Sequence, residues 1–430
     1  MNIRSFSPDV PDRAMIERPI WSTWARFGNT VNQTDVEQFL EQITARGLPI
    51  SNLELDDKWT THYGDFEMDE AKFPNVTRLS AAIRSAGARL TAWIHPFVNV
   101  ESRNGRDESL RRYFVADSSG KSASADWWAG RGYSVDFTND EAADWYIEQL
   151  RQTQMKYEIF SFKFDAGELD TLPHDFRLYN TGADPNEYTR AYVRNAARLG
   201  NAIEVRVGSG TQKATVFYRI MDRNSTWKDM GLVTVIPSVL HCSLNGYFWV
   251  LPDMIGGNGG RSHPSKELFI RWVQVNTLLV AMQFSIAPFD YDEETVEIVD
   301  KMLKLRQKFM PYMLKEAERA AANGQPLIRP MWWASEDPKA LDVFDQFLVG
   351  DNLFAAPVVV ESVRSRDVFI PEGSWFNINR DTWFVGPSVV RIEAGLDTLS
   401  IFINKAYLST ETNGDNGTNL EAISASLRLC

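Results

Sequence analysis

Short apolar runs alternate with amphipathic stretches from about residue 19 to residue 290. The runs have the length and the β-branched or aromatic content of buried strands, and the stretches between them repeat apolar residues at the helical period. The predicted strands are 19–24, 53–57, 90–96, 160–166, 204–208, 216–222, 246–253 and 283–289. The predicted helices are 35–46, 75–86, 141–157, 188–201 and 265–281. Eight strands that alternate with helices are typical of the α/β class and of a (β/α)8 TIM barrel, whose active site lies at the carboxyl ends of the strands.

The pattern changes after a long predicted helix at 293–322. Short alternating strands and turn signals follow, and they predict a small antiparallel β-sandwich domain. These strands are 347–360, 367–370, 374–378, 389–394 and 398–403. We therefore expect four regions, namely a flexible leader at 1–18, the catalytic barrel at 19–323, the C-terminal β-sandwich at 324–408 and a disordered tail at 409–430.

Composition narrows the classes of function. The chain has 430 residues, enough for one large barrel with an accessory domain, and its net charge of 45 − 57 = −12 argues against nucleic acid or an anionic membrane as a partner. Two cysteines cannot form a disulfide scaffold, and the five histidines show no metal-binding spacing. No apolar run reaches 18 residues, so we expect no membrane segment in this chain.

Polar residues gather at the ends of the predicted strands. They are Asp56, Asp57, His95, Lys163, Asp165, Arg206, Asp222 and Asp253. Alternation along a strand places Lys163 and Asp165 on the same face, where a cation can keep a carboxylate ionised. A buried ion pair without chemistry is the alternative explanation.

Two of the carboxylates suit the hydrolysis of an acetal. Asp165 and Asp222 end different strands, and hydrolysis needs a carboxylate nucleophile on one side of the bond and a proton donor on the other. We expect Asp165 to be the nucleophile, because Lys163 is beside it. Asp222 has apolar neighbours that favour its protonated form, although a helix N-cap is the alternative role. This pair needs no metal and no organic cofactor.

Several further residues are candidates for binding a sugar. Asp56 and Asp57 could accept hydrogen bonds from two hydroxyl groups, unless they belong to a solvated loop. Arg206 has apolar neighbours and should point inward, with the aspartates as its partners. Trp127 and Trp128 could form an apolar wall against a sugar ring, or one of them could pack in the core.

With these residues in view, the chain resembles glycoside hydrolase family 31, and most closely its myogenesis-regulating glycosidase branch. The most specific segments are 55–57, 93–97, 163–168, 204–208 and 250–259. The resemblance implies a retaining double displacement on an α-glycoside, with Asp165 as nucleophile and Asp222 as acid/base. The candidate substrate-binding residues are Asp56, Asp57, His95, Trp128, Lys163, Arg206 and Asp253.

Two departures from the family pattern favour galactose as the bound sugar. Family 31 α-glucosidases usually have Trp-x-Asp-Met-Asn-Glu around the nucleophile, whereas this chain has Lys-Phe-Asp-Ala-Gly-Glu at 163–168. The related clan of α-galactosidases uses Lys-x-Asp there and Asp-Asp-x-Trp on an earlier strand, which 56–59 matches. The usual histidine near the eighth strand is replaced by the segment 286–290.

The resemblance also sets expectations about context. Members usually carry a large β-sandwich before the barrel, where this chain has about eighteen residues, so we expect a truncated chain, a partial gene product or a shortened form. The leading hypothesis is an exo-acting α-galactosidase that acts on an oligosaccharide or glycoconjugate. An α-glucosidase and a catalytically impaired sugar-binding homologue are the alternatives. Whether the protein forms a homodimer is left open. The resemblance to this branch implies a location in the lumen of the endoplasmic reticulum.

Overall fold

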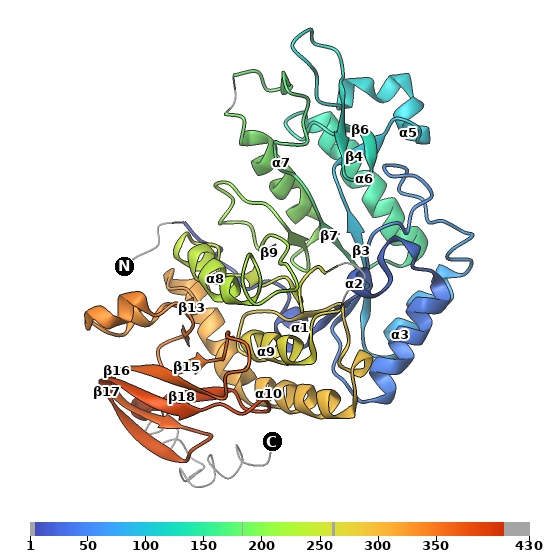
Figure 1. Ribbon diagram of the computed structural model, residues 1–430. Helices are drawn as coiled ribbons and strands as arrows, with labels where there is room; N and C mark the ends of the chain where they lie inside the picture. The colour runs from blue at the N-terminus through green and yellow to red at the C-terminus, as the bar shows by residue number, and fades with distance from the viewer. Residues whose placement is uncertain (1–4, 183, 260–262, 408–430) are drawn as a thin grey trace. The chain divides into compact units, whose positions relative to one another are not determined.

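The computed structural model describes residues 5–182, 184–259 and 263–407, which form two compact units (Figure 1). One unit consists of residues 11–219. The other consists of residues 220–407 together with the short N-terminal segment 5–10.

The unit of residues 11–219 is built on a parallel sheet of six strands. In spatial order they are β9 (Phe217–Arg219), β8 (Glu204–Val205), β7 (Ser161–Phe164), β3 (Arg89–Ile94), β2 (Asn52–Leu55) and β1 (Ile20–Ser22). The helices between them are α3 (Gln33–Ala45), α4 (Val76–Ser85), α6 (Asp140–Tyr157) and α7 (Glu187–Ala196). Six predicted strands are thus confirmed in position, although each is shorter than expected. Because all six run the same way, their carboxyl ends lie along one edge.

The helices begin where polar caps precede an apolar stripe. At the start of α3 the side chain of Asn32 accepts a hydrogen bond from the backbone of Asp35, and the carboxylate of Asp35 accepts one from the backbone of Asn32. This reciprocal pair satisfies backbone donors that the first helical turn leaves open. The residues that α3 buries toward the sheet include Val36, Phe39 and Ile43, which recur at helical spacing.

Two features of this unit differ from the sequence prediction. A small antiparallel sheet of β4 (Phe97–Asn99), β6 (Gly130–Ser134) and β5 (Ser124–Trp127) follows β3. The predicted flexible leader contains helix α1 (Arg13–Glu17), whose Met15 and Ile16 are buried. The preceding Asp12 forms a two-point ion pair with Arg89, which anchors this segment to the start of β3.

The other unit begins with the remaining barrel elements. They are β10 (Val250–Leu251), β11 (Met254–Ile255), β12 (Gln283–Phe284), α8 (Val235–Leu244), α9 (Lys266–Asn276) and the long α10 (Glu293–Asn323). β11 and β12 are parallel. Arg306 of α10 is buried and donates hydrogen bonds to the carbonyl oxygens of Thr277, Leu279 and Val280, which fixes the chain that follows α9.

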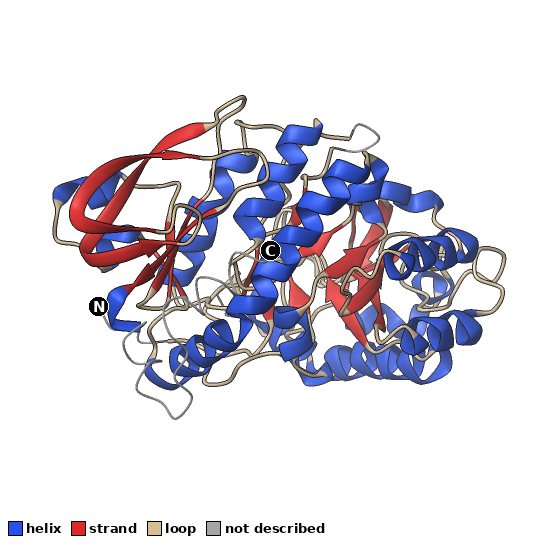
Figure 2. Ribbon diagram, turned by 90° about the horizontal axis from the view of Figure 1, so that it is seen from below, coloured by secondary structure: helices blue, strands red, loops and turns tan. Residues whose placement is uncertain are grey.

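The same unit ends in a six-stranded antiparallel sheet, with its long strands side by side at the red end of the chain in Figure 1 and curved in Figure 2. In spatial order its strands are β13 (Ile328–Arg329), β14 (Phe347–Val349), β15 (Leu353–Ala356), β18 (Ser400–Asn404), β16 (Ser365–Asn377) and β17 (Thr382–Glu393). The strands predicted at 367–370 and 374–378 are one strand with a bulge. The predicted tail at 409–430 lies outside the described residues. Within the described part of the chain, no helix is both long and apolar enough to cross a membrane.

Candidate active site

Asp165 lies directly after β7, at the carboxyl edge of the parallel sheet, and three side chains hold its carboxylate. Oδ1 is 3.0 Å from Nη1 of Arg206 and 3.0 Å from Nη2 of Arg219. Oδ2 accepts a hydrogen bond of 3.0 Å from Nε1 of Trp93. The sequence pattern predicts the partnership of Arg206 with an aspartate, but it does not point to Arg219 or Trp93.

The backbone after Asp165 is held in an unusual conformation. Ala166 has φ of 58°, in the left-handed region that non-glycine residues rarely adopt, and Gly167 has φ of 96°. A Cβ atom on Gly167 would lie 2.5 Å from the ring of Tyr192. The hydroxyl group of Tyr192 donates to the carbonyl oxygen of Asp165 at 2.7 Å. Such local strain is typical of a functional site that the surrounding structure holds in place.

Electrostatics keep Asp165 ionised. Burial by itself would raise the pKa of Asp165, but the positive charges of Arg219, Arg206 and, to a lesser extent, Lys163 lower it to about 2. The sequence pattern predicts this effect from Lys163, which is the smallest of the three charge contributions. The two guanidinium groups make the larger contribution because they are in direct contact with the carboxylate.

Lys163 lies on β7 and is surrounded by carboxylates. Its Nζ is 2.9 Å from Asp56, 3.1 Å from Glu54 and 3.7 Å from Glu204, and all four side chains are buried. Burial would lower the pKa of Lys163, but the neighbouring carboxylates raise it well above its usual value, so the ammonium group keeps its charge. We call these four residues the lysine cluster.

Glu204 connects the lysine cluster to the site around Asp165. Its Oε1 lies 3.6 Å from Nε of Arg219, whose other end contacts Asp165. Burial and the negative charge of Glu54 raise the pKa of Glu204 to about 8. Glu204 was not among the predicted site residues, although it lies on the same face as Arg206 along the same predicted strand.

The two neighbouring aspartates have different surroundings. β2 ends at Leu55, so Asp56 and Asp57 lie beyond the regular alternation. Asp56 contacts Lys163, whereas Oδ1 of Asp57 accepts a hydrogen bond of 2.7 Å from the hydroxyl group of Tyr63. Burial raises the pKa of Asp57 to about 6, and the hydrogen bond from Tyr63 opposes the rise. Both aspartates are buried, which differs from the alternative of a solvated loop.

His95 belongs to an aromatic cluster beside these residues. Its ring centre is 4.8 Å from that of Trp93, 4.7 Å from that of Trp127 and 5.4 Å from that of Tyr63. Nδ1 of His95 accepts a hydrogen bond from the backbone of Phe97. Burial lowers the pKa of His95 to about 3, so its ring is neutral near pH 7 and cannot supply a positive charge.

The two adjacent tryptophans have separate roles. Trp127 is 8% exposed and donates its indole hydrogen to Asn99, so it belongs to the core. Trp128 is 52% exposed, and the guanidinium group of Arg206 lies 5.2 Å from its ring centre. An exposed aromatic face next to a charged site is suited to contact with the apolar face of a ligand.

Asp222 and Asp253 belong to the other unit. Asp253 is fully buried, and its Oδ2 accepts a hydrogen bond of 2.8 Å from the backbone N–H of Arg223. The backbone N–H of Asn258 donates to the carbonyl oxygen of Arg223 at 2.6 Å. The segment after β10 therefore braces the backbone next to Asp222. The pairing of Asp222 with Asp165 stays a prediction.

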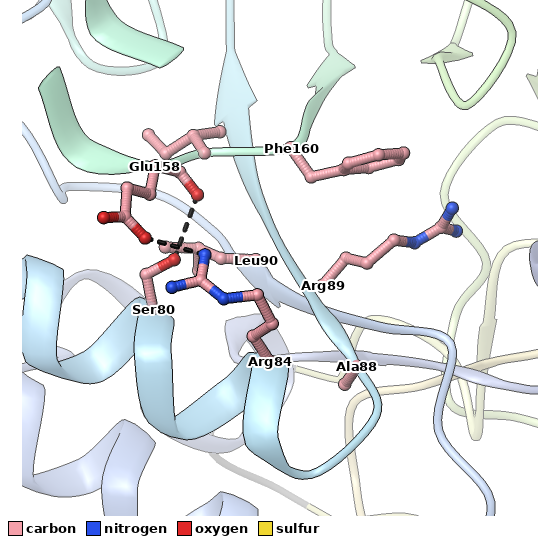
Figure 3. A pocket seen from close by; sticks show the side chains of 8 residues that line it. Ser80, Arg84, Ala88, Arg89, Leu90, Glu158 and Phe160 are labelled. Carbon is pink, nitrogen blue, oxygen red and sulfur yellow. Dashed lines mark hydrogen bonds and ion pairs between the residues drawn. The ribbon is translucent and has the colours of Figure 1, made fainter. Parts of the chain in front are cut away.

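A cavity of about 290 Å³ lies at the amino ends of β3 and β7, whereas Asp165 follows the carboxyl end of β7 (Figure 3). Arg84 and Glu158 form an ion pair across it, and Ser80 donates a hydrogen bond to the carbonyl oxygen of Glu158. Phe160 packs over the guanidinium group of Arg89, which is paired with Asp12. None of the predicted site residues lines this cavity, so we do not assign it to the active site.

Comparison with known proteins identifies two family models along the chain. The model described as the glycosyl hydrolases family 31 TIM-barrel domain matches residues 18–316, and that described as the glycosyl hydrolase family 31 C-terminal domain matches residues 324–407. The predicted barrel followed by a β domain is thus confirmed as the fold class.

Individual relatives agree with these matches. The chain is 42% identical over 379 residues to the myogenesis-regulating glycosidase of Mus musculus, covering 85% of this chain and 53% of the relative. It is 30% identical over 365 residues to an alpha-xylosidase of Emericella nidulans, covering 79% of this chain and 46% of the relative. A GH31 alpha-xylosidase from a soil metagenome, solved with xylose, has a TM-score of 0.84 at 22% identity, covering 93% of this chain and 64% of that one. The chain spans about half the length of the curated relatives it matches.

Proposed function

The chain belongs to glycoside hydrolase family 31, and from this premise we propose that it is a retaining, exo-acting α-glycoside hydrolase with the specificity of an α-galactosidase. The observation that carries the proposal is the buried carboxylate of Asp165, held between Arg206 and Arg219 next to the lysine cluster. We further propose that the barrel extends over residues 19–323 and the C-terminal β domain over 324–408.

The proposed reaction has two displacements. In the first, an oxygen of Asp165 forms a bond to the anomeric carbon while the bond to the leaving oxygen breaks and Asp222 gives that oxygen a proton. In the second, Asp222 takes a proton from water, the water oxygen bonds to the anomeric carbon, and Asp165 leaves as a carboxylate. The low pKa of Asp165 supports the nucleophile role, because the residue is ionised at every pH at which the protein is expected to work.

The lysine cluster supports the choice of galactose. Lys163 keeps its charge and is held by Asp56, so an ammonium donor and a carboxylate acceptor lie side by side at 2.9 Å. Such a pair can bind a hydroxyl group that both donates and accepts a hydrogen bond. The resemblance to the related clan of α-galactosidases implies that this hydroxyl group is the axial one of galactose. Trp128 then provides the apolar wall of the same subsite.

A panel of nitrophenyl α-glycosides tests the proposal. We expect hydrolysis of the α-galactoside at a kcat/KM at least ten times that for the α-glucoside or the α-xyloside. Asp165→Asn should abolish turnover, and Asp126→Asn, at an exposed position of β5, is the matched control that should keep it. Faster turnover of the glucoside or the xyloside would overturn the galactose assignment but leave the catalytic pair in place.

A sugar-binding protein without turnover is the second candidate that the comparisons leave open, since this chain spans about half of its curated relatives. Binding of galactose by titration calorimetry, with no hydrolysis of the panel and no effect of Asp165→Asn, would establish that function instead.

A further inference from the structure

We infer that Arg219 is a positioning residue for the second displacement, in which it acts through Asp165 to speed release of the sugar from the enzyme. This inference rests on the proposed function. Arg219 is the last residue of β9 and contacts the proposed nucleophile Asp165 directly. Neither the sequence pattern nor the family resemblance identified it.

The contacts distinguish the two oxygen atoms of Asp165. Oδ1 is 3.0 Å from both Arg206 and Arg219, so two positive charges stabilise negative charge on it. Within the described residues, the hydrogen bond to Oδ2 comes from the neutral indole of Trp93. The structure therefore assigns Oδ2 as the attacking oxygen and Oδ1 as the anchored oxygen.

The two displacements place opposite demands on this carboxylate. When Oδ2 bonds to the anomeric carbon, Asp165 loses its negative charge, so the arginines no longer have a carboxylate charge to stabilise. When water displaces Oδ2, the bond to carbon breaks, both bonding electrons return to Oδ2, and the carboxylate charge reappears next to the arginines. Positive charge held in advance at that position favours the step in which the negative charge develops. The arginines therefore make Asp165 a better leaving group in the second step than a carboxylate without them.

Arg219 is more deeply buried than Arg206 and contacts the same oxygen atom of the nucleophile. Arg206 shares its charge with Glu168, which accepts two hydrogen bonds from it at 2.7 and 3.0 Å. Arg219 also lies 3.6 Å from Glu204, whose pKa is raised to about 8 by burial and by the charge of Glu54. Arg219 therefore contacts Asp165 more closely than it contacts Glu204. Its side chain is only 3% exposed, so it acts through the nucleophile and not on the aglycone.

Rapid-quench kinetics with a nitrophenyl α-glycoside test the inference in two variants, Arg219→Gln and Arg219→Lys. For Arg219→Gln we expect kcat to fall about 100-fold, as for other removed stabilisers of developing charge, while kcat/KM falls less than tenfold. A burst of about one nitrophenol per enzyme molecule and a protein mass increased by one hexosyl group should accompany the loss. Arg219→Lys should restore part of kcat, because it keeps the positive charge.

Controls separate this inference from a structural effect and from the proposed function. Arg89→Gln removes another partly buried, ion-paired arginine at the opposite end of the strands and should leave kcat unchanged (Figure 3). Equal losses of kcat and kcat/KM in both Arg219 variants, without a burst or an adduct, would overturn the inference while hydrolysis by the unsubstituted protein upholds the proposed function. If the unsubstituted protein hydrolyses no member of the panel, the proposed function fails and the inference fails with it.

Discussion

The buried carboxyl group of Glu204 leads to a prediction about stability and pH. Burial and the charge of Glu54 raise the pKa of Glu204 from 4.5 to about 8 in the folded state. A raised carboxyl pKa means that the folded state holds a proton that the unfolded chain releases. The resulting stabilisation is complete below pH 4.5 and is lost as the pH rises through 8. Glu204→Gln has no proton to lose, so its stability should not change in this way.

The magnitude follows from the size of the shift. Each pKa unit corresponds to about 1.4 kcal/mol, so a rise from 4.5 to about 8 corresponds to about 5 kcal/mol. Natural domains have an unfolding free energy of about 5–15 kcal/mol, and the effect is therefore large enough to measure. Between pH 5 and pH 9 the free energy of unfolding of Glu204→Gln should rise relative to that of the unsubstituted protein by several kcal/mol.

Urea unfolding followed by tryptophan fluorescence at pH 5, 7 and 9 would measure this difference. The chain has 14 tryptophans, which provide a strong signal. Glu41→Gln, at an exposed position of α3, is the matched control and should give a constant difference at all three pH values. A constant difference for Glu204→Gln as well would refute the reasoning, because it would mean that Glu204 does not hold a proton in the folded state.

Three further predictions concern other parts of the molecule. Trp128→Ala should raise KM about tenfold and change kcat by less than a factor of three in steady-state kinetics, because the ring faces the proposed ligand. Its thermal unfolding midpoint should not change, because the ring is half-exposed. A lowered midpoint would show that the ring packs in the core. Tyr63→Phe should raise the pKa of Asp57 above about 6, because it removes a hydrogen bond to the ionised carboxylate. The acid limb of the pH profile of kcat/KM should then move to higher pH. If the acid limb does not move, Asp57 is not the group that produces it. Arg271→Met should lower the free energy of unfolding by about 3 kcal/mol in urea titrations, because the buried guanidinium group donates to three main-chain carbonyl oxygens, and a loss below 1 kcal/mol would contradict this account.

The sequence pattern located the strands because barrel strands are buried on both faces and stand out as apolar runs. It placed their ends less well, since the alternation continues past the last ladder hydrogen bond. The strand predicted at 204–208, for example, is regular only over Glu204–Val205. The sheet of β4, β5 and β6 was missed, because its strands are short, β5 and β6 are partly exposed, and the glycines of β6 read as turns.

Candidate residues were found where charge interrupts an apolar run, and two were missed in spite of that signal. Arg219 lies between Tyr218 and Ile220, and Glu204 lies between Ile203 and Val205, so both show the pattern that identified Arg206. Pattern alone could not decide which of two adjacent tryptophans is buried, because that depends on the turn between β5 and β6. It also left open whether Asp57 points inward beside Asp56, because the direction of that side chain depends on whether the strand ends or bulges there.

The division of charges explains why the site can tolerate so many buried ionisable groups. Buried ion pairs stabilise a fold weakly, and apolar residues of the same size often serve a core better. Here the charges fall into two linked sets. Arg206 and Arg219 set the ionisation of Asp165, and the carboxylates of the lysine cluster set that of Lys163. Because Lys163 contributes less than the two arginines to the ionisation of the nucleophile, its ammonium group can be committed to a ligand hydroxyl. A substitution that weakens only the lysine cluster should therefore alter sugar preference more than the chemical step, whereas loss of an arginine should alter the chemical step on every sugar.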